Sequence, residues 1–346
     1  MPGAGPATMN VAAPDAIDYT AAPSLARARQ HSLALIEQVR AVLAAQPAPS
    51  LETVAVGGSL GRLEASVASD FDCLLVARDD ASDGAVREDV ERVMHALAGT
   101  GLALPKADGI YRQAVTRAAL LDPAARGCLD EAPAVFGKRM QCLLDARPLA
   151  GDAAFARLRH DVVAWYAQDF VLTRPRRSWS ALVNDLSRYL HAYAVWQQFK
   201  TDSSADDSWA LRQAKLRSVR MLTFAGLLCL LGASNHREDK VTWLLARLDA
   251  TPLERLAQLM REHHEAATFD ALLCAYDAAH AVLADPAARA ALVALPLARA
   301  QAASDPADGP YGRIRAASEQ VMTLLTRFIL ARHGEWDERF FVRLVL

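Results

Sequence analysis

The chain has 346 residues, 52% of them hydrophobic, which is enough for two domains of ordinary size with a sizeable core. Its net charge is −2 and its pI is near 6.5, so the composition gives no support to a broad nucleic-acid-binding face, although a small basic groove is compatible with it. Five cysteines, an odd number without a CxxC pair, count against a disulfide framework or zinc knuckle and favour free thiols in a reducing cytosol.

The N-terminal segment is rich in Ala, Pro and Gly and lacks both a basic stretch and a long apolar run. We therefore expect a disordered tail over residues 1–24 and no signal peptide. The longest apolar run, Met221–Ala233, is shorter than the ~20 residues that span a bilayer. These features predict a soluble cytoplasmic protein without a membrane partner.

Apolar residues in the first part of the chain follow helical spacing in some segments and strand spacing in others. The predicted elements are helix 25–45, strand 53–56, strand 71–77, helix 84–98 and strand 141–145. Pro47 and Pro49 are expected to end the first helix, and Pro148 the last strand. Residues 101–120 fit neither period clearly.

Strand patterns cease after Gly151, and helical spacing dominates the rest of the chain. Helices are predicted at 152–172, 178–200, 208–232, 238–249, 252–267, 268–284 and 313–333. Two polar stretches, 201–207 and 303–312, predict loops. The fold class expected is therefore α+β, with a small mixed-sheet domain over residues 25–151 and an all-helical domain over residues 152–346.

The stretch GGSLGRLEASVASDFD, residues 57–72, holds the residues with the clearest chemical potential. Gly57 and Gly58 end a predicted strand, where glycines allow a ligand to approach the backbone closely. Ser59 adds a hydroxyl beside free backbone N–H groups, and such a turn can bind phosphate oxygens. Arg62 is placed to add positive charge to the same phosphates.

Asp70 and Asp72 follow this turn and begin the next predicted strand. Alternate residues of a strand project from one face, so the two carboxylates are expected side by side. Their mutual repulsion favours a bound cation. Mg²⁺ suits the pair, because it binds one or two carboxylates together with substrate phosphates.

Each part of this pattern also has a structural interpretation. A GGS sequence alone is an ordinary turn, and a DxD sequence alone is more often a solvated strand edge or a cap. The combination of strand, GGS turn, short connection, SDxD and apolar strand is narrower. It favours a catalytic metal and phosphate site over the structural alternative.

The same stretch resembles the signature of the DNA polymerase β-type nucleotidyltransferase superfamily. It is most similar to the catalytic domain of bacterial PII-protein uridylyltransferases and to related nucleotidyltransferases of unknown substrate. A second segment, GKRMQCLLDARPLAGDAAFARLR at 137–159, resembles the part that closes the catalytic domain in that group. The two segments together cover roughly residues 51–160. That group carries a helical substrate-binding domain after the catalytic one, to which residues 152–346 would correspond.

This resemblance implies a metal-dependent reaction. Ser59 is expected to contact the β- or γ-phosphate of an NTP, ATP being one candidate, and Asp70 and Asp72 to hold two Mg²⁺ or Mn²⁺ ions. Asp145, in the sequence DAR, is expected to be the third carboxylate, which also ligates metal; the alternative is a helix or turn cap. Arg62 and Glu64 match the family pattern as well, and the structural alternative for Glu64 is that it pairs with Arg62 and holds the turn.

The reaction implied is transfer of a nucleoside monophosphate to an acceptor hydroxyl with release of pyrophosphate. The acceptor expected is a protein side chain or a small molecule, because the lack of net positive charge counts against nucleic acid. His160 and Asp161 form an HD pair without companion ligands, so the nucleotide-removing activity of PII uridylyltransferases is not implied.

In the helical half, Asn184, Arg188 and Lys215 are the candidates for nucleotide or acceptor contacts. Asn184 and Arg188 lie four residues apart and so share a helix face. The alternative for all of them is a solvated surface with ion pairs between helices. Two other functions remain open at this point: a non-catalytic regulator that binds nucleotide, and a toxin–antitoxin-type interaction protein with the same fold.

Overall fold

The computed structural model describes residues 17–107, 109–168, 179–203, 208–296, 300 and 309–345. Within them a four-stranded sheet has the order β3-β2-β1-β4. Its strands are β1 (Leu51–Gly57), β2 (Asp72–Ala77), β3 (Ala114–Thr116) and β4 (Arg147–Ala150). The central strand β1 runs antiparallel to β2 and β4, whereas β2 and β3 are parallel, so the sheet is mixed.

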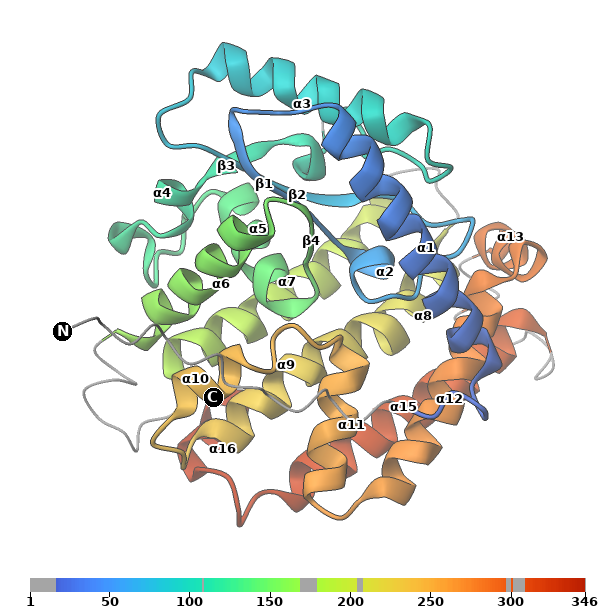
Figure 1. The fold of residues 1–346 in the computed structure, drawn as a ribbon. Helices are drawn as coiled ribbons and strands as arrows, with labels where there is room; N and C mark the ends of the chain where they lie inside the picture. The colour runs from blue at the N-terminus through green and yellow to red at the C-terminus, as the bar shows by residue number, and fades with distance from the viewer. Residues whose placement is uncertain are drawn as a thin grey trace.

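Both faces of the sheet are buried, because successive side chains of its central strands alternate between two hydrophobic clusters. Val54 and Val56 pack on one side with helices α1 (Pro23–Ala45) and α3 (Asp83–Ala98). Ala55 packs on the other side with α5 (Pro133–Leu144), α6 (Asp152–Ala167) and the helices of the C-terminal half. Figure 1 shows the sheet between these two layers.

The C-terminal half consists of helices in the part of the chain that the structure describes. They are α7 (Ser180–Ser203), α8 (Trp209–Lys215), the π-helical segment η3 (Leu216–Arg220), α9 (Met221–Ser234), α10 (Lys240–Leu245), α11 (Pro252–Glu262), α12 (Ala266–Ala284), α13 (Pro286–Ala294), α15 (Pro310–Ala331) and α16 (Glu338–Val345). Short helices complete the first half: α2 (Gly58–Gly61), η1 (Ile110–Arg112), α4 (Arg117–Leu120) and η2 (Pro123–Ala125). The predicted α+β fold class, a small mixed sheet followed by helices, is confirmed.

The strand predicted over residues 141–145 is wrong. Gln141–Leu144 form the last turn of α5, which begins at Pro133, and the strand is β4 instead. A short apolar run does not distinguish a strand from a buried helix segment, which explains the error. Pro148, expected to end a strand, lies inside β4 opposite Ala55. It is tolerated there because β4 is an edge strand.

Two expectations from composition also need correction. Ile17 and Ala22 are 8% and 0% exposed and belong to the core, so the expected disordered tail does not reach residue 24; residues 1–16 lie outside the described part. The continuous helix Trp209–Ser234 has 26 residues and is long and apolar enough to cross a bilayer. In its most apolar window 67% is buried inside the protein, which is typical of a core helix.

The two predicted loops lie largely outside the described residues. Residues 201–203 belong to α7, whereas 204–207 are not described. In the second stretch, α15 begins at Pro310, and residues 303–308 are not described.

Candidate active site

The turn between β1 and β2 contains two glycines, Gly58 and Gly61. Any other residue type at these positions would force neighbouring atoms to move. Gly58 has φ +64°, and a Cβ atom there would lie 2.1 Å from Asp72 Oδ2. A Cβ atom on Gly61 would lie 2.3 Å from the carbonyl oxygen of Asp145. The turn is therefore packed directly against Asp72 and Asp145. Ser59, between these glycines, is half-buried.

Asp72 is the first residue of β2 and lies opposite Gly57 in the sheet register. It has the same strand parity as Leu74 and Val76, which face the C-terminal helices, so its side chain is directed to that layer. Asp70 is exposed and forms an isolated bridge with Ala103. Asp70 and Asp72 interact electrostatically, but β2 begins only at Asp72, and the side-by-side arrangement of the two carboxylates on one strand face stays a prediction.

Two side chains of helix α5 form hydrogen bonds with the backbone at the start of β2. Gln141 Nε2 donates to the carbonyl oxygen of Asp72 at 2.6 Å. The buried Lys138 donates from Nζ to the carbonyl oxygen of Cys73 at 3.1 Å. These two bonds hold the strand that carries Asp72, and neither residue was singled out from the sequence. Gln141 lies in the segment that was predicted to be a strand, and Lys138 lies in a stretch to which no element was assigned.

The pKa of Asp72 is raised to about 6. Burial is the largest cause, followed by repulsion from Asp70, and Asp145 adds to the same effect. Arg220 and Arg62 act in the opposite direction but do not cancel it. Negative charge is therefore in excess around Asp72, and a cation would offset it.

Asp145 reaches the turn from the C-terminal end of α5 rather than from the end of a strand. Its Oδ2 atom accepts hydrogen bonds from the backbone N–H of Gly58 at 3.2 Å and from Arg62 Nη1 at 2.7 Å. Arg62 also donates from Nε to Glu64 Oε2 at 2.8 Å. The side chains of all three residues of this ion-pair chain are 5% exposed. Arg62 therefore holds Asp145 and Glu64 in place, and the expected pairing of Glu64 with Arg62 is present.

Nowhere in the described ranges are three Asp, Glu, His or Cys side chains grouped closely enough to form a ready-made metal site. Asp145 is held by Arg62 and Gly58, which explains why it does not complete a triad with Asp70 and Asp72. The paired acids still fit Mg²⁺ or Mn²⁺, because such an ion can use one or two carboxylates and take its other ligands from substrate phosphates and water. The raised pKa of Asp72 supports this fit.

Two cationic side chains of the C-terminal half interact electrostatically with the acids. Lys215, at the end of α8, interacts electrostatically with Asp70 and Asp72. Arg220, at the end of η3, interacts with Asp72. Both side chains are half-buried. The structure thus brings the predicted residue Lys215 to the acids and adds Arg220, which the sequence did not indicate.

The other two candidates of the helical half are placed differently. Arg188 donates to the carbonyl oxygen of Cys128 at 2.8 Å, and its guanidinium lies 4.1 Å from the ring centre of Phe136. It also forms an ion pair with Asp185 at 3.5 Å. These contacts give Arg188 a packing role between α7 and the loop before α5. Asn184 is exposed on α7.

Helix α12 connects the turn between β1 and β2 to α1. His280 Nε2 lies 3.1 Å from the carbonyl oxygen of Glu64, and its Nδ1 lies 2.9 Å from Ser24 Oγ. Asp277 Oδ1 accepts the backbone N–H of Leu25 at 2.7 Å. The buried Tyr276 interacts with Glu64 and Arg62, and its pKa is raised by burial and by Glu64. The C-terminal half therefore supports the residues that hold Asp145.

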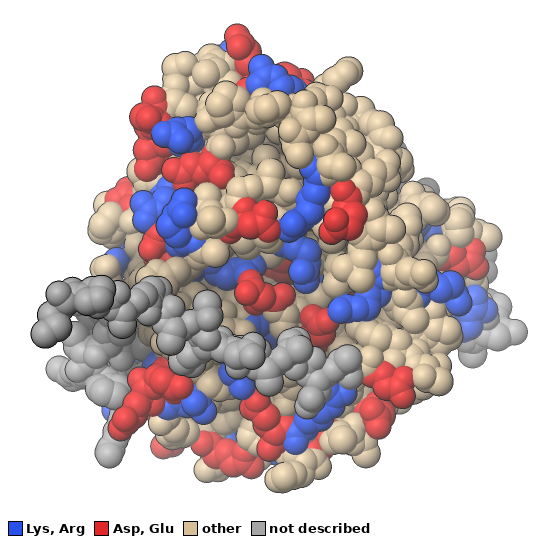
Figure 2. Space-filling view, viewed as in Figure 1, with Lys and Arg blue, Asp and Glu red and all other residues tan. Residues whose placement is uncertain are grey.

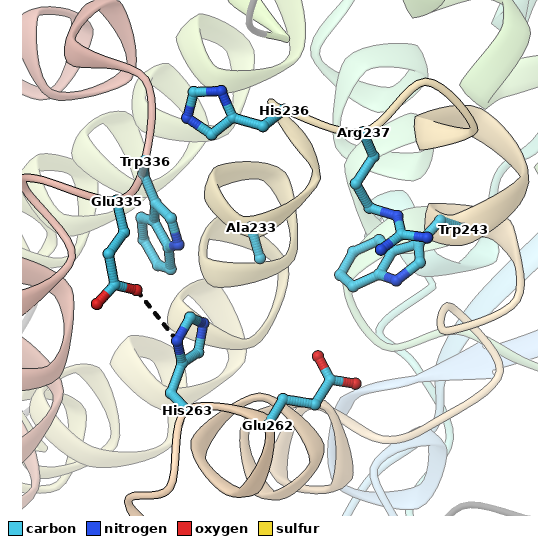
Figure 3. A pocket seen from close by; sticks show the side chains of 8 residues that line it. All are labelled: Ala233, His236, Arg237, Trp243, Glu262, His263, Glu335 and Trp336. Atoms are coloured by element: carbon cyan, nitrogen blue, oxygen red, sulfur yellow. Dashed lines mark ion pairs between the residues drawn. The ribbon is translucent and has the colours of Figure 1, made fainter.

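A cavity of about 300 Å³ lies elsewhere in the helical half, between α9, α10, α11 and the connection from α15 to α16 (Figure 3). Trp243 and Trp336 stand on opposite sides of it. The acids of this cavity already have partners. Glu335 lies 3.1 Å from His263, and Glu262 lies 2.9 Å from Arg247, just after α10. The acidic residues of the turn do not line this cavity.

Comparison with known proteins adds one match. Residues 24–119 match a family model described as "Putative nucleotidyltransferase DUF294". No curated protein matches the chain. The matched segment includes the glycine-serine turn, Asp70 and Asp72, so this part of the chain is similar to that family of nucleotidyltransferase type. Asp145, Lys215 and the remaining helices lie beyond it. The match supports the broad superfamily, not the narrower relation to PII uridylyltransferases.

Proposed function

We propose that this chain, which is similar to a nucleotidyltransferase family over residues 24–119, transfers a nucleoside monophosphate from an NTP to an acceptor hydroxyl and releases pyrophosphate. The observation that carries this proposal is the interacting carboxylates of Asp70 and Asp72 next to a glycine-serine turn, with Lys215 interacting with both. Acids, phosphate-binding turn and cation are the parts that phosphoryl transfer needs.

Asp70 and Asp72 would hold a divalent cation, Mg²⁺ or Mn²⁺, and a second ion would involve Asp145. When bound, such ions supply neutralisation of phosphate charge. Ser59 would bind phosphate oxygens through its hydroxyl and the backbone of the turn, and Gly57 and Gly58 would let the phosphates approach closely, although the Gly58 N–H itself is bonded to Asp145. Lys215 would add positive charge to the same phosphates. Arg62 supports the site by holding Asp145, because its guanidinium is already engaged.

The reaction follows from these roles. The acceptor oxygen forms a bond to the α-phosphorus, and the bond between that phosphorus and the oxygen bridging to the β-phosphorus breaks. The bridging oxygen leaves with pyrophosphate. The hydroxyl proton passes to a carboxylate, for which we assign Asp145, because Oδ2 accepts from Arg62 and Gly58 while Oδ1 keeps its lone pairs. Positioning and charge neutralisation supply most of the rate.

The acceptor that we propose is a protein side chain or a small molecule. Figure 2 shows Lys and Arg interspersed with Asp and Glu over the face it presents, without a broad basic area for nucleic acid. The free cysteines suit a reducing compartment. We therefore place the activity in the cytoplasm, where NTPs are at hand.

The proposal is tested by incubating the full chain with each of the four labelled NTPs, Mg²⁺ and a cell lysate. We expect label on a protein or small molecule together with stoichiometric pyrophosphate. Binding of NTP without either product would instead identify a non-catalytic regulator. Absence of both binding and transfer by the folded protein would refute the enzyme proposal.

Lys215 gives the site an expected pH dependence. Burial is the largest cause that lowers its pKa to about 8, Arg289 and Arg220 add to this, and Asp70 and Asp72 oppose it. Bound phosphates favour the charged form, so nucleotide affinity should be full below pH 8 and fall as Lys215 loses its proton above it. Between pH 7 and 9 the expected loss is up to about tenfold.

This dependence is measured by titrating a non-hydrolysable NTP at constant Mg²⁺. In Lys215→Arg the charge persists at pH 9, so the loss of affinity should disappear. An identical pH profile in the two proteins would show that another group is responsible.

A further inference from the structure

The helix that crosses beneath the sheet contains a π-helical interruption. Between α8 and α9, segment η3 covers Leu216–Arg220. Ser218 Oγ donates back to the carbonyl oxygen of Ala214 at 2.7 Å, and Thr223 Oγ1 donates to that of Val219 at 2.8 Å. Such back-bonding often bends helices, and π segments are rare and concentrate at functional sites. The interruption therefore calls for a functional explanation.

The π segment changes which side chains share a face. Lys215 and Arg220 are five residues apart, so in a regular α-helix they would point in clearly different directions. A π-helix bonds residue i to residue i+5, which brings these positions closer to one face. Both side chains accordingly interact with Asp72. The α-helical period alone therefore does not predict that Lys215 and Arg220 lie on one face.

Arg220 is half-buried, and its guanidinium lies 4.7 Å from the ring centre of Tyr193. Tyr189 and Tyr111 also interact electrostatically with Arg220. Within the described ranges it makes this ring contact but no ion pair or hydrogen bond. More deeply buried arginines have direct partners: Arg139 has the carboxylate of Glu131, and Arg255 donates to four backbone carbonyl oxygens. A half-buried charge without a direct hydrogen-bonded partner is costly, so binding of an anion at Arg220 would be favourable.

Charge balance indicates which kind of anion Lys215 and Arg220 would bind. A divalent cation on Asp70 and Asp72 would neutralise both carboxylates and leave the positive charges of Lys215 and Arg220 uncompensated. Tyr193 offers only its ring face to Arg220. A ligand with about two further negative charges fits the site, as the β- and γ-phosphates of a nucleotide do.

We propose that Arg220 binds the β- and γ-phosphates of the nucleotide and stabilises the pyrophosphate that leaves, with η3 setting it against Asp72 and Tyr193 orienting it. This inference rests on the proposed function and deepens it, because it assigns the site to triphosphates and not to nucleoside monophosphates. Negative charge develops on the bridging oxygen as its bond to the α-phosphorus breaks, and a guanidinium stabilises such charge.

The test measures binding of inorganic pyrophosphate and tripolyphosphate to the full chain by calorimetry, with Mg²⁺ present. We expect Arg220→Met to weaken binding roughly tenfold to hundredfold, as loss of a charge-assisted bond does. Arg220→Lys should weaken it less. Arg217→Met is the matched control, because Arg217 lies in the same π segment but is not among the main groups that shift the pKa of Asp72. It should bind tripolyphosphate like the original chain. Melting curves establish that each variant is folded.

The outcomes separate this inference from the proposed function. Unchanged binding in folded Arg220→Met, equal weakening in Arg217→Met, or no tripolyphosphate binding by the original chain would each overturn the role of Arg220. If Arg220→Met and Arg220→Lys both failed to fold, the role would be structural, and the proposal would also fall. If binding depends on Arg220 but no NTP is ever transferred, the anion site stands and the transferase proposal fails.

Discussion

Asp72→Asn is expected to lower the rate of nucleotide transfer by at least ~10²–10³-fold while making the metal-free protein more resistant to heat. The amide keeps the shape of the side chain but removes the charge that attracts a divalent cation. The gain in stability follows from the pKa of Asp72, which is raised from 3.8 to about 6 by burial and by Asp70. A raised carboxyl pKa means that ionisation opposes folding, so the native state loses stability as pH rises through 6.

Transfer assays and melting curves at pH 7.5, with and without Mg²⁺, measure both effects. Mg²⁺ should raise the melting temperature of the original chain and not that of Asp72→Asn, because the ion binds only where its ligands are charged. Asp80→Asn is the control, since Asp80 is an exposed acid paired with Arg78 on the surface. Full activity in Asp72→Asn would remove the residue from the reaction. A lower melting temperature would show that its charge is not in excess.

Gly58→Ala is expected to abolish most activity by moving Asp72 without changing any charged group. The residue has φ +64°, which costs an alanine about 1–2 kcal/mol, and the new Cβ would lie 2.1 Å from Asp72 Oδ2. Either the turn or the carboxylate must move. We expect at least a ~10-fold fall in kcat/KM, because small displacements of catalytic groups have large effects on rate. The melting temperature should fall as well.

Gly99→Ala is the matched control for this substitution. Gly99 has φ −82°, and an added Cβ would meet nothing within 4 Å. Its replacement should leave activity unchanged and the melting temperature equal or slightly higher. Wild-type activity in a folded Gly58→Ala protein would contradict the close packing of turn and acid. Equal losses in both variants would point to general sensitivity to glycine replacement.

The sequence predicts the fold class and the central motif because these depend on local patterns. Strand periods around 53–56 and 71–77, with glycines and alternate acids between them, identify the turn and the orientation of Asp72. The error at 141–145 has a different origin, since Gln141–Leu144 are apolar enough for either element. Asp145 nevertheless reaches the turn, because β4 follows α5 after only two residues and pairs with β1 beside Gly57.

Residues that act through tertiary contacts could not be predicted in the same way. Arg220 meets Asp72 because η3 departs from the α-helical period, and no local pattern announces this. Arg188 illustrates the opposite case. Its helix face suggested a ligand contact, but the loop that carries Cys128 folds back and accepts its hydrogen bond. Helical spacing shows which side chains lie together, and only the packed neighbours decide whether they remain available.

The shared core has a consequence for how such a protein can vary. Ala55, Leu74 and Val76 pack in the same cluster as the C-terminal helices, and α12 holds the turn through His280. The C-terminal helices, which would recognise the acceptor, thus also cover one face of the sheet that carries the candidate active site. New acceptors must be gained by changing solvent-facing positions of the helices, because exchanging these helices as a module would uncover the sheet and release the turn together.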